Sequence, residues 1–173
     1  MVWPVTLLSV ITNALVFGVI LSAILFPVIL VIVRINPEIM LRDYPPDVQA
    51  KYGPMSDRTK RQRIPIALGV LTLLLAVILA SLAPVRTATD AGSPFPTAFA
   101  HFFAMFSVFN LLDWLVLDWL IVVTLHPRFL ILPGTEGMAG YRDYAFHFRG
   151  FLVGIPITLV ASLLLAGLVT VLL

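Results

Sequence analysis

Four long apolar runs constrain this chain more than any other feature of its sequence. A helix needs roughly 20 apolar residues to cross about 30 Å of hydrocarbon, because each residue adds about 1.5 Å. The sequence contains four such runs, at about 5–33, 64–85, 97–125 and 149–173. Arg149 stands at the start of the last run, and only Asp113 and Asp118 carry charge inside the runs. We therefore predict an all-α, polytopic membrane protein, in which residues 1–173 form a single four-helix transmembrane domain.

Composition excludes several other classes of protein. Of the 173 residues, 60% are hydrophobic and only 12% are charged, whereas a soluble domain carries roughly 25% charged residues. Too little polar surface remains to cover a globule in water, and a disordered chain is excluded for the same reason. Because the chain has no Cys, thiol catalysis, Cys-ligated zinc and iron–sulfur clusters are excluded as well. The formal net charge of +2 is too small to indicate a nucleic-acid partner.

The distribution of Lys and Arg predicts an orientation. Ten of the 11 basic residues lie in segment 34–63 or between residues 126 and 149, which leaves only Arg86 in the connector 86–96. Basic loops stay on the cytoplasmic side of a membrane. We therefore expect segments 34–63 and 126–148 to be cytoplasmic loops and both chain termini to be extracytoplasmic. The expected location is the cell (inner or plasma) membrane, with multiple passes through the lipid bilayer.

The third run carries an acidic face. An ionised carboxylate in hydrocarbon is costly, so Asp113 and Asp118 are candidates for function. On an α-helical wheel they share one side with Asn110, yet they diverge by about 140°, so one tight bidentate site is not expected. A divalent metal ion bound by these aspartates is left open. Asn110 is expected to join helices through hydrogen bonds. We predict Asp118, the aspartate nearer the cytoplasmic end, as the functional centre, with Asp113 supporting it.

The second cytoplasmic segment adds further polar candidates. Pro127 ends the third helix and leaves His126 at its negative end, while the turn at 133–137 presents Glu136. Asp143 and His147 are four residues apart, so on one helix they would share a face as an acid–base or metal pair. Alternatively, these side chains form an interfacial belt at headgroup depth. The full set of candidates is Asp118, Asp113, His147, Asp143 and Glu136 for catalysis, with Asn110, His126, Arg128, Tyr141 and Arg142 for binding.

Two patterns predict local structure. Pro46 suits the first position of a helix and Gly53-Pro54 ends one, which indicates a short helix on the membrane surface. In the fourth run, small residues recur every four positions and favour close packing of helices. They are Gly150, Gly154, Thr158, Ser162, Ala166 and Thr170. We expect this stripe to pack within the chain, and a homo-oligomer formed through the fourth span is the alternative.

One resemblance accompanies these residues. The loop Pro133-Gly-Thr-Glu-Gly137, with the acidic third span before it and Tyr141-Arg-Asp-Tyr144 after it, is similar to a group of small uncharacterised bacterial four-span membrane proteins. The resemblance covers most of the chain. It implies a four-span fold in a bacterial inner membrane, and it implies no activity.

Three functions remain open from the sequence. The first is a small membrane enzyme that acts on a lipid-like or amphipathic substrate at an acidic site open to the cytoplasm. The second is an oligomeric ion or proton conductor, or a transporter, that uses Asp113 and Asp118 and takes a cation. The third is a scaffold or assembly subunit without a ligand site. The enzyme hypothesis requires a cavity beside Asp118, a conductor requires polar groups across the whole membrane, and a scaffold requires both aspartates sealed by direct partners.

Overall fold

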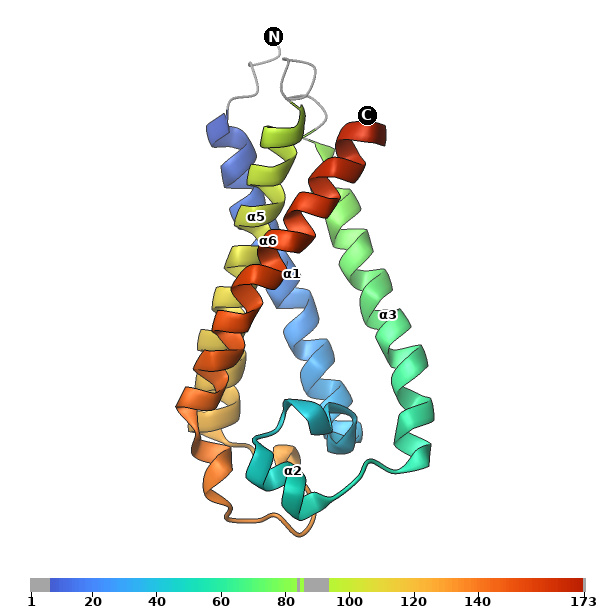
Figure 1. Cartoon of the computed structure of the whole chain (residues 1–173), viewed down its shortest axis with the longest axis vertical. Helices are drawn as coiled ribbons and strands as arrows, with labels where there is room; N and C mark the ends of the chain where they lie inside the picture. The colour runs from blue at the N-terminus through green and yellow to red at the C-terminus, as the bar shows by residue number, and fades with distance from the viewer. Residues whose placement is uncertain (1–6, 84, 86–93, 173) are drawn as a thin grey trace.

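The computed structural model describes residues 7–83, 85 and 94–172 of the chain (Figure 1). Within those residues every regular element is helical. Four helices are long and apolar enough to cross a membrane. They are α1 (Leu7–Ile35), α3 (Asp57–Ser81), α5 (Pro94–Leu112) continued by η2 (Asp113–Leu125), and α6 (Tyr144–Leu172). The predicted all-α, four-span fold is thereby confirmed, whereas the orientation of the termini stays a prediction. Most of the predicted outer connector, including Arg86, lies outside the described residues.

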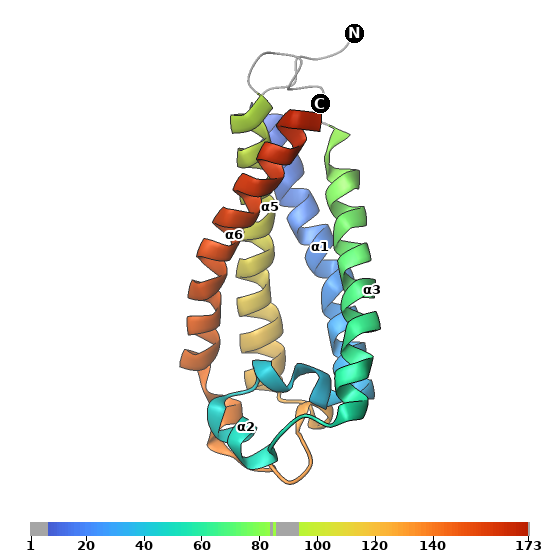
Figure 2. The same ribbon diagram turned by 45° about the vertical axis from the view of Figure 1, so that its right-hand side comes forward.

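The four helices form a wedge rather than a uniform bundle. α5 packs against both α1 and α6, and α3 packs against α1. In both views the helices lie closest together where α1 begins and α6 ends, and they spread apart toward α2 (Pro46–Tyr52) (Figures 1 and 2). An apolar core fills the narrow end and includes Ala14, Phe102, Met105 and Ala166, all fully buried. The wide end is therefore the part of the molecule in which a cavity can form.

Two helices begin earlier than the apolar runs suggest, because polar residues cap them. α3 begins at Asp57 instead of residue 64, and the Ser56 side chain caps it by accepting a hydrogen bond from the Thr59 N–H. α6 begins at Tyr144 instead of residue 149, because Oδ1 of Asp143 accepts a hydrogen bond of 2.9 Å from the Phe146 N–H. Such caps satisfy amide groups that the first turn leaves unpaired. Hydrophobicity marks where a helix enters the membrane, and it does not mark where the helix starts.

The two basic segments fold together into a cap at the wide end, formed by residues 36–56 and 126–143. Its elements are η1 (Pro37–Asp43), α2, η3 (Arg128–Leu130) and η4 (Ala139–Arg142). The Tyr44 hydroxyl donates to the Leu130 carbonyl over 2.7 Å, and the Gly140 N–H donates to Asp47 over 3.1 Å. The short helix predicted from Pro46 to Gly53 is confirmed as α2. The predicted loops thus pack against each other as one folded unit.

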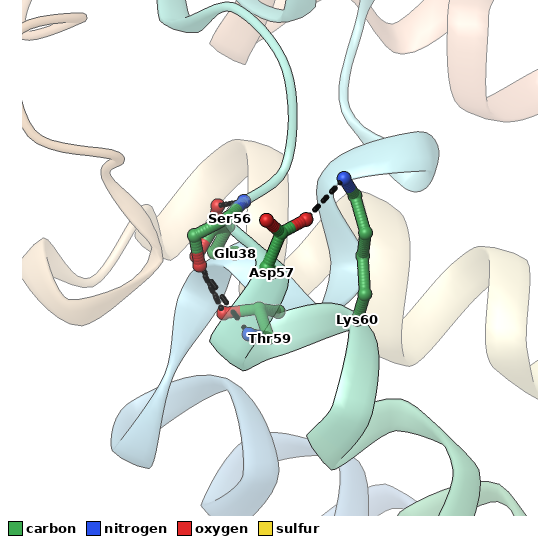
Figure 3. Close-up of polar contacts among 5 residues, drawn as sticks. All are labelled: Glu38, Ser56, Asp57, Thr59 and Lys60. Carbon is green, nitrogen blue, oxygen red and sulfur yellow. Dashed lines mark hydrogen bonds and ion pairs between the residues drawn. The ribbon is translucent and has the colours of Figure 1, made fainter.

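A second contact fastens the cap to α3 (Figure 3). The Glu38 carboxylate accepts hydrogen bonds from the Ser56 hydroxyl, at 2.7 Å, and from the Ser56 N–H and the Thr59 hydroxyl. Burial by itself would raise the pKa of Glu38, but these hydrogen bonds lower the pKa below its ordinary value. Nearby, Lys60 and Asp57 form an exposed ion pair of 2.8 Å. η1 is therefore held at the beginning of α3.

Candidate functional site

The acidic part of the third span is a π-helix. Over Asp113–Leu125 the hydrogen bonds reach five residues back, as when the His126 N–H donates to the Ile121 carbonyl over 3.0 Å. π-helices are rare and occur frequently at functional sites. With bonds between residues five apart, Asp113 and Asp118 lie near one face of the helix. The expected divergence of about 140°, which assumed α-helical geometry, was therefore wrong.

Both aspartates line a cavity of about 700 Å³ at the wide end of the wedge. Its walls come from α1, the α5–η2 helix and α6, and the cap covers it, whereas α3 contributes no lining residue. Ligand pockets typically have volumes of about 300–1,000 Å³. The polar lining residues are Arg42, Asp43, Tyr44, Asn110, Asp113, Asp118, Tyr141, His147 and Arg149. The cavity can therefore hold a small molecule against charged and polar side chains.

A contact between two ionisable side chains in the cavity wall joins Asp118 to His147. Nδ1 of His147 lies 3.0 Å from Oδ1 of Asp118, and the two side chains are 8% and 24% exposed, respectively. His147 lies in the first turn of α6, and Asp118 comes from η2. A carboxylate at this nitrogen orients the imidazole ring. The pair therefore presents an oriented imidazole in the wall of the cavity.

Asn110 joins α5 to α6, as expected from the sequence. Its side-chain amide donates to the Phe151 carbonyl over 3.2 Å. A Cβ atom on Gly154 would collide with the Asn110 side chain, so the glycine of the small-residue stripe makes room for this bond. Trp114 stacks on Phe151 with ring centroids 4.6 Å apart. Together these contacts build the deep wall of the cavity.

The stripe packs within the chain along much of α6. Thr158, Ser162 and Ala166 are buried, and the Ser162 hydroxyl donates to the Thr158 carbonyl over 2.6 Å. Small side chains at this spacing let two helices approach closely. The contact made by the stripe is therefore the one between α5 and α6.

Asp43 is a cavity residue that the sequence analysis missed. It ends η1 and lines the cavity beside Arg42. Burial raises the pKa of Asp43, Arg63 opposes that effect, and the negative charge of Asp118 adds to it. No local pattern marks this residue, because it lies in a polar loop that is brought over the membrane helices only when the cap folds.

Two of the predicted catalytic residues do not reach the cavity. Glu136 is exposed and accepts a hydrogen bond of 3.1 Å from the Gly134 N–H. Hydrogen bonding to its own N–H and to that of Gly134 lowers the pKa of Glu136. Asp143 caps α6 and does not line the cavity. His147 therefore pairs with Asp118, and not with Asp143 as the four-residue spacing suggested.

The predicted binding residues fall into two places. Asn110 and Tyr141 line the cavity. His126 and Arg142 line a separate hollow of about 420 Å³ in the cap, and Tyr141 contributes to its wall as well. Arg128 is exposed and lines neither hollow. The cavity and the hollow in the cap are therefore adjacent, because both contain Tyr141 in their walls, and they are two separate places.

The carboxylates do not form a ready metal site. In the described part of the chain, no three His, Asp or Glu side chains are close enough together to hold a metal ion. Asp118 has His147 as its direct partner.

No family model, curated protein or solved structure matches this chain. The resemblance based on the loop at 133–137 therefore stays a prediction, and functional conclusions rest on the site itself.

Proposed function

We propose that this multi-pass membrane protein is a small membrane enzyme that acts on a lipid-like, amphipathic substrate held in the cavity. The observation that carries the proposal is the contact between Asp118 and His147 in the wall of a cavity of about 700 Å³. Next to this polar wall the cavity has an apolar one, which includes Ile29, Leu30 and Leu117. A molecule with a polar head and a hydrocarbon part fits such a lining.

The proposed chemistry is general acid–base catalysis. Asp118 holds Nδ1 of His147, so Nε2 is the nitrogen that accepts a proton from a water molecule or a substrate hydroxyl and later returns it. No Ser, Thr or Cys is among the residues described as lining the cavity. Water or a hydroxyl of the substrate itself is the proposed nucleophile. Asp113 lies on the same face of η2 and also lines the cavity.

Two observations weigh against the other hypotheses. A conductor needs polar groups along the whole path, but at the narrow end of the wedge the buried contact of His101 with Ser81 is surrounded by buried apolar side chains such as Phe102 and Met105. A scaffold subunit needs both aspartates sealed by direct partners, whereas both line an open cavity. An enzyme site or ligand site explains the cavity better than either alternative.

The test compares Asp118→Asn and His147→Gln with the wild type. Each purified protein is reconstituted in vesicles of mixed glycerophospholipids and isoprenoid phosphate lipids, and lipid products are followed by mass spectrometry. We expect the wild type to convert one lipid class and both variants to lose at least about 100-fold in rate, the contribution typical of a positioned acid–base group. Glu136→Gln is the matched control, because Glu136 is exposed and lies outside the cavity. Equal conversion by Asp118→Asn and the wild type would contradict the proposal.

A further inference from the structure

α1 and α6 both line the cavity without packing against each other, and we call the side of the cavity between them its open side. α1 and α6 each pack against α5, and contacts between α1 and α6 are too few to count as packing. α3 lies against α1 and contributes nothing to the cavity lining. In both views α1 and α6 move apart toward the cap (Figures 1 and 2). In a bilayer, this open side faces lipid.

Along the edges of the open side, a charged residue and apolar residues lie at different depths in the membrane. On α6, Arg149 and Val153 line the cavity one helical turn apart, so they share a face of the helix. Val153 is 60% exposed, which places it at the outer edge of the opening. On the α1 side, Ile29, Leu30 and Val33 line the cavity. The apolar edge therefore lies deeper in the membrane than the arginine.

A second arginine reaches the cavity from the cap. Arg42, in η1, lines the cavity and is exposed. Guanidinium groups at the end of a membrane helix lie at headgroup depth and bind phosphate well. Asp43 and Asp118 also line the cavity, and their negative charges disfavour a phosphate close to them. The two arginines are therefore the place where an anionic headgroup is stabilised.

We propose that the cavity takes a phosphate-bearing glycerolipid directly from the bilayer, through the side opening between α1 and α6. The phosphate binds Arg42 and Arg149, and one acyl chain passes between Val153 and Leu30 into the apolar part of the cavity. This inference rests on the proposed function, because it names the class of lipid-like substrate and its route to the Asp118–His147 pair.

The test uses a phosphatidylglycerol probe with a photoactivatable acyl chain in phosphatidylcholine vesicles that contain the whole protein. Lipids surrounding the protein label its outer surface, including the exposed Leu68 of α3. Leu117 lines the cavity and is only 7% exposed, so a label there reports a lipid inside. We expect labelling at both places in the wild type. Labelling of α3 with none on the cavity side of η2 would overturn the inference.

Two pairs of variants sharpen the result. Val153→Trp narrows the opening and should abolish the label at Leu117. The matched control is Val160→Trp, which changes a residue of the same helix that is 54% exposed and lies outside the cavity.

The double change Arg42→Gln with Arg149→Gln should weaken cavity labelling about tenfold. Arg58→Gln with Arg61→Gln removes the same charge from α3, away from the cavity, and should not weaken it. Equal effects within either pair would contradict the proposed route.

The label on Leu68 serves as the folding control for each variant. The variant Asp118→Asn distinguishes the enzyme proposal from the proposed lipid route. We expect cavity labelling to persist in Asp118→Asn, because entry depends on the opening and the arginines. Cavity labelling without any Asp118-dependent conversion would overturn the enzyme proposal and leave the lipid route standing. Asp118-dependent conversion without cavity labelling would overturn the lipid route and leave the enzyme proposal standing with another amphiphile.

Discussion

Glu38 and Asp43 lie in the same short helix, η1, and their surroundings move their pKa values in opposite directions. Hydrogen bonds from Thr59 and Ser56 outweigh the effect of burial and lower the pKa of Glu38. Burial, together with the charge of Asp118, outweighs Arg63 and Arg42 and raises the pKa of Asp43. Glu38 is thus suited to hold the cap while charged. Asp43 accepts a proton more readily at the cavity.

The lowered pKa of Glu38 predicts how stability depends on pH. A carboxyl group with a lower pKa in the folded state stabilises the fold above its unfolded pKa, near 4.5, and this contribution disappears as pH falls through the folded value. Glu38→Gln should therefore lower the free energy of unfolding at pH 7 by about 1.5–3 kcal/mol. In this variant the free energy of unfolding should also fall less steeply as the pH decreases below about 4.5.

Denaturant titrations in detergent at several pH values provide the measurement. Glu136→Gln is the control, because the other Glu of the chain is exposed and bonded only within its own turn. Because Glu136 is fully exposed to solvent, its substitution should change the free energy of unfolding and its pH dependence much less than Glu38→Gln does. If both variants gave the same pH profile, the contact between η1 and α3 would not be a source of stability.

At the scale of the element, the third membrane helix changes type where its acidic face begins. α5 is α-helical to Leu112, and η2 is π-helical from Asp113. α5 is also the element against which α1 and α6 pack, so close approach of helix backbones along it holds the wedge together. Gly18 of α1 makes one such approach: a Cβ atom there would lie 2.7 Å from the Met105 carbonyl oxygen.

Gly18→Ala should therefore destabilise the protein, by about 1–3 kcal/mol as expected for overpacking. A matched change is available in α3, where a Cβ on Gly69 would meet nothing within 4 Å. Gly69→Ala should be neutral or stabilising by up to about 1 kcal/mol, because alanine favours a helix over glycine. Thermal unfolding in detergent compares the two variants. Equal losses of stability would contradict the close packing of α1 on α5.

At the scale of the whole molecule, the wedge has two chemically different ends. The narrow end is mostly apolar, with one buried polar contact between His101 and Ser81, and it contains the beginning of α1 and the end of α6 (Figure 2). The wide end contains the cavity, the cap and ten of the 11 basic residues of the chain. The positive-inside rule predicts that the basic end is cytoplasmic. With that orientation the cavity would lie at the inner leaflet of the membrane, together with the proposed substrate and its route.

Labelling of single cysteines tests this orientation, and the natural chain has no Cys that would interfere. Lys51→Cys places a thiol on the exposed part of α2. A membrane-impermeant maleimide should label it only after the membrane is opened. Asp90→Cys, in the predicted outer connector, should be labelled in intact cells. Labelling of Lys51→Cys from outside would reverse the predicted topology.

Local patterns in the sequence were enough to predict the four membrane helices, the basic segments between them and the short helix at Pro46. Each depends on nearby residues: length and hydrophobicity for a span, and proline and glycine at the ends of a helix. Asp113, Asp118 and Asn110 could be selected in the same way, because a polar side chain within an apolar run is conspicuous.

The tertiary structure alone decided how these residues meet. The π-helix puts Asp113 and Asp118 on one face, and a wheel drawn for an α-helix cannot show this. The pairing of His147 with Asp118, 29 positions apart in the chain, and the arrival of Asp43 at the cavity depend on the packing of α6 and the folding of the cap. Sequence periodicity reports which face of a helix is polar. Which side chains share a cavity depends on contacts between distant segments, and no local pattern encodes those contacts.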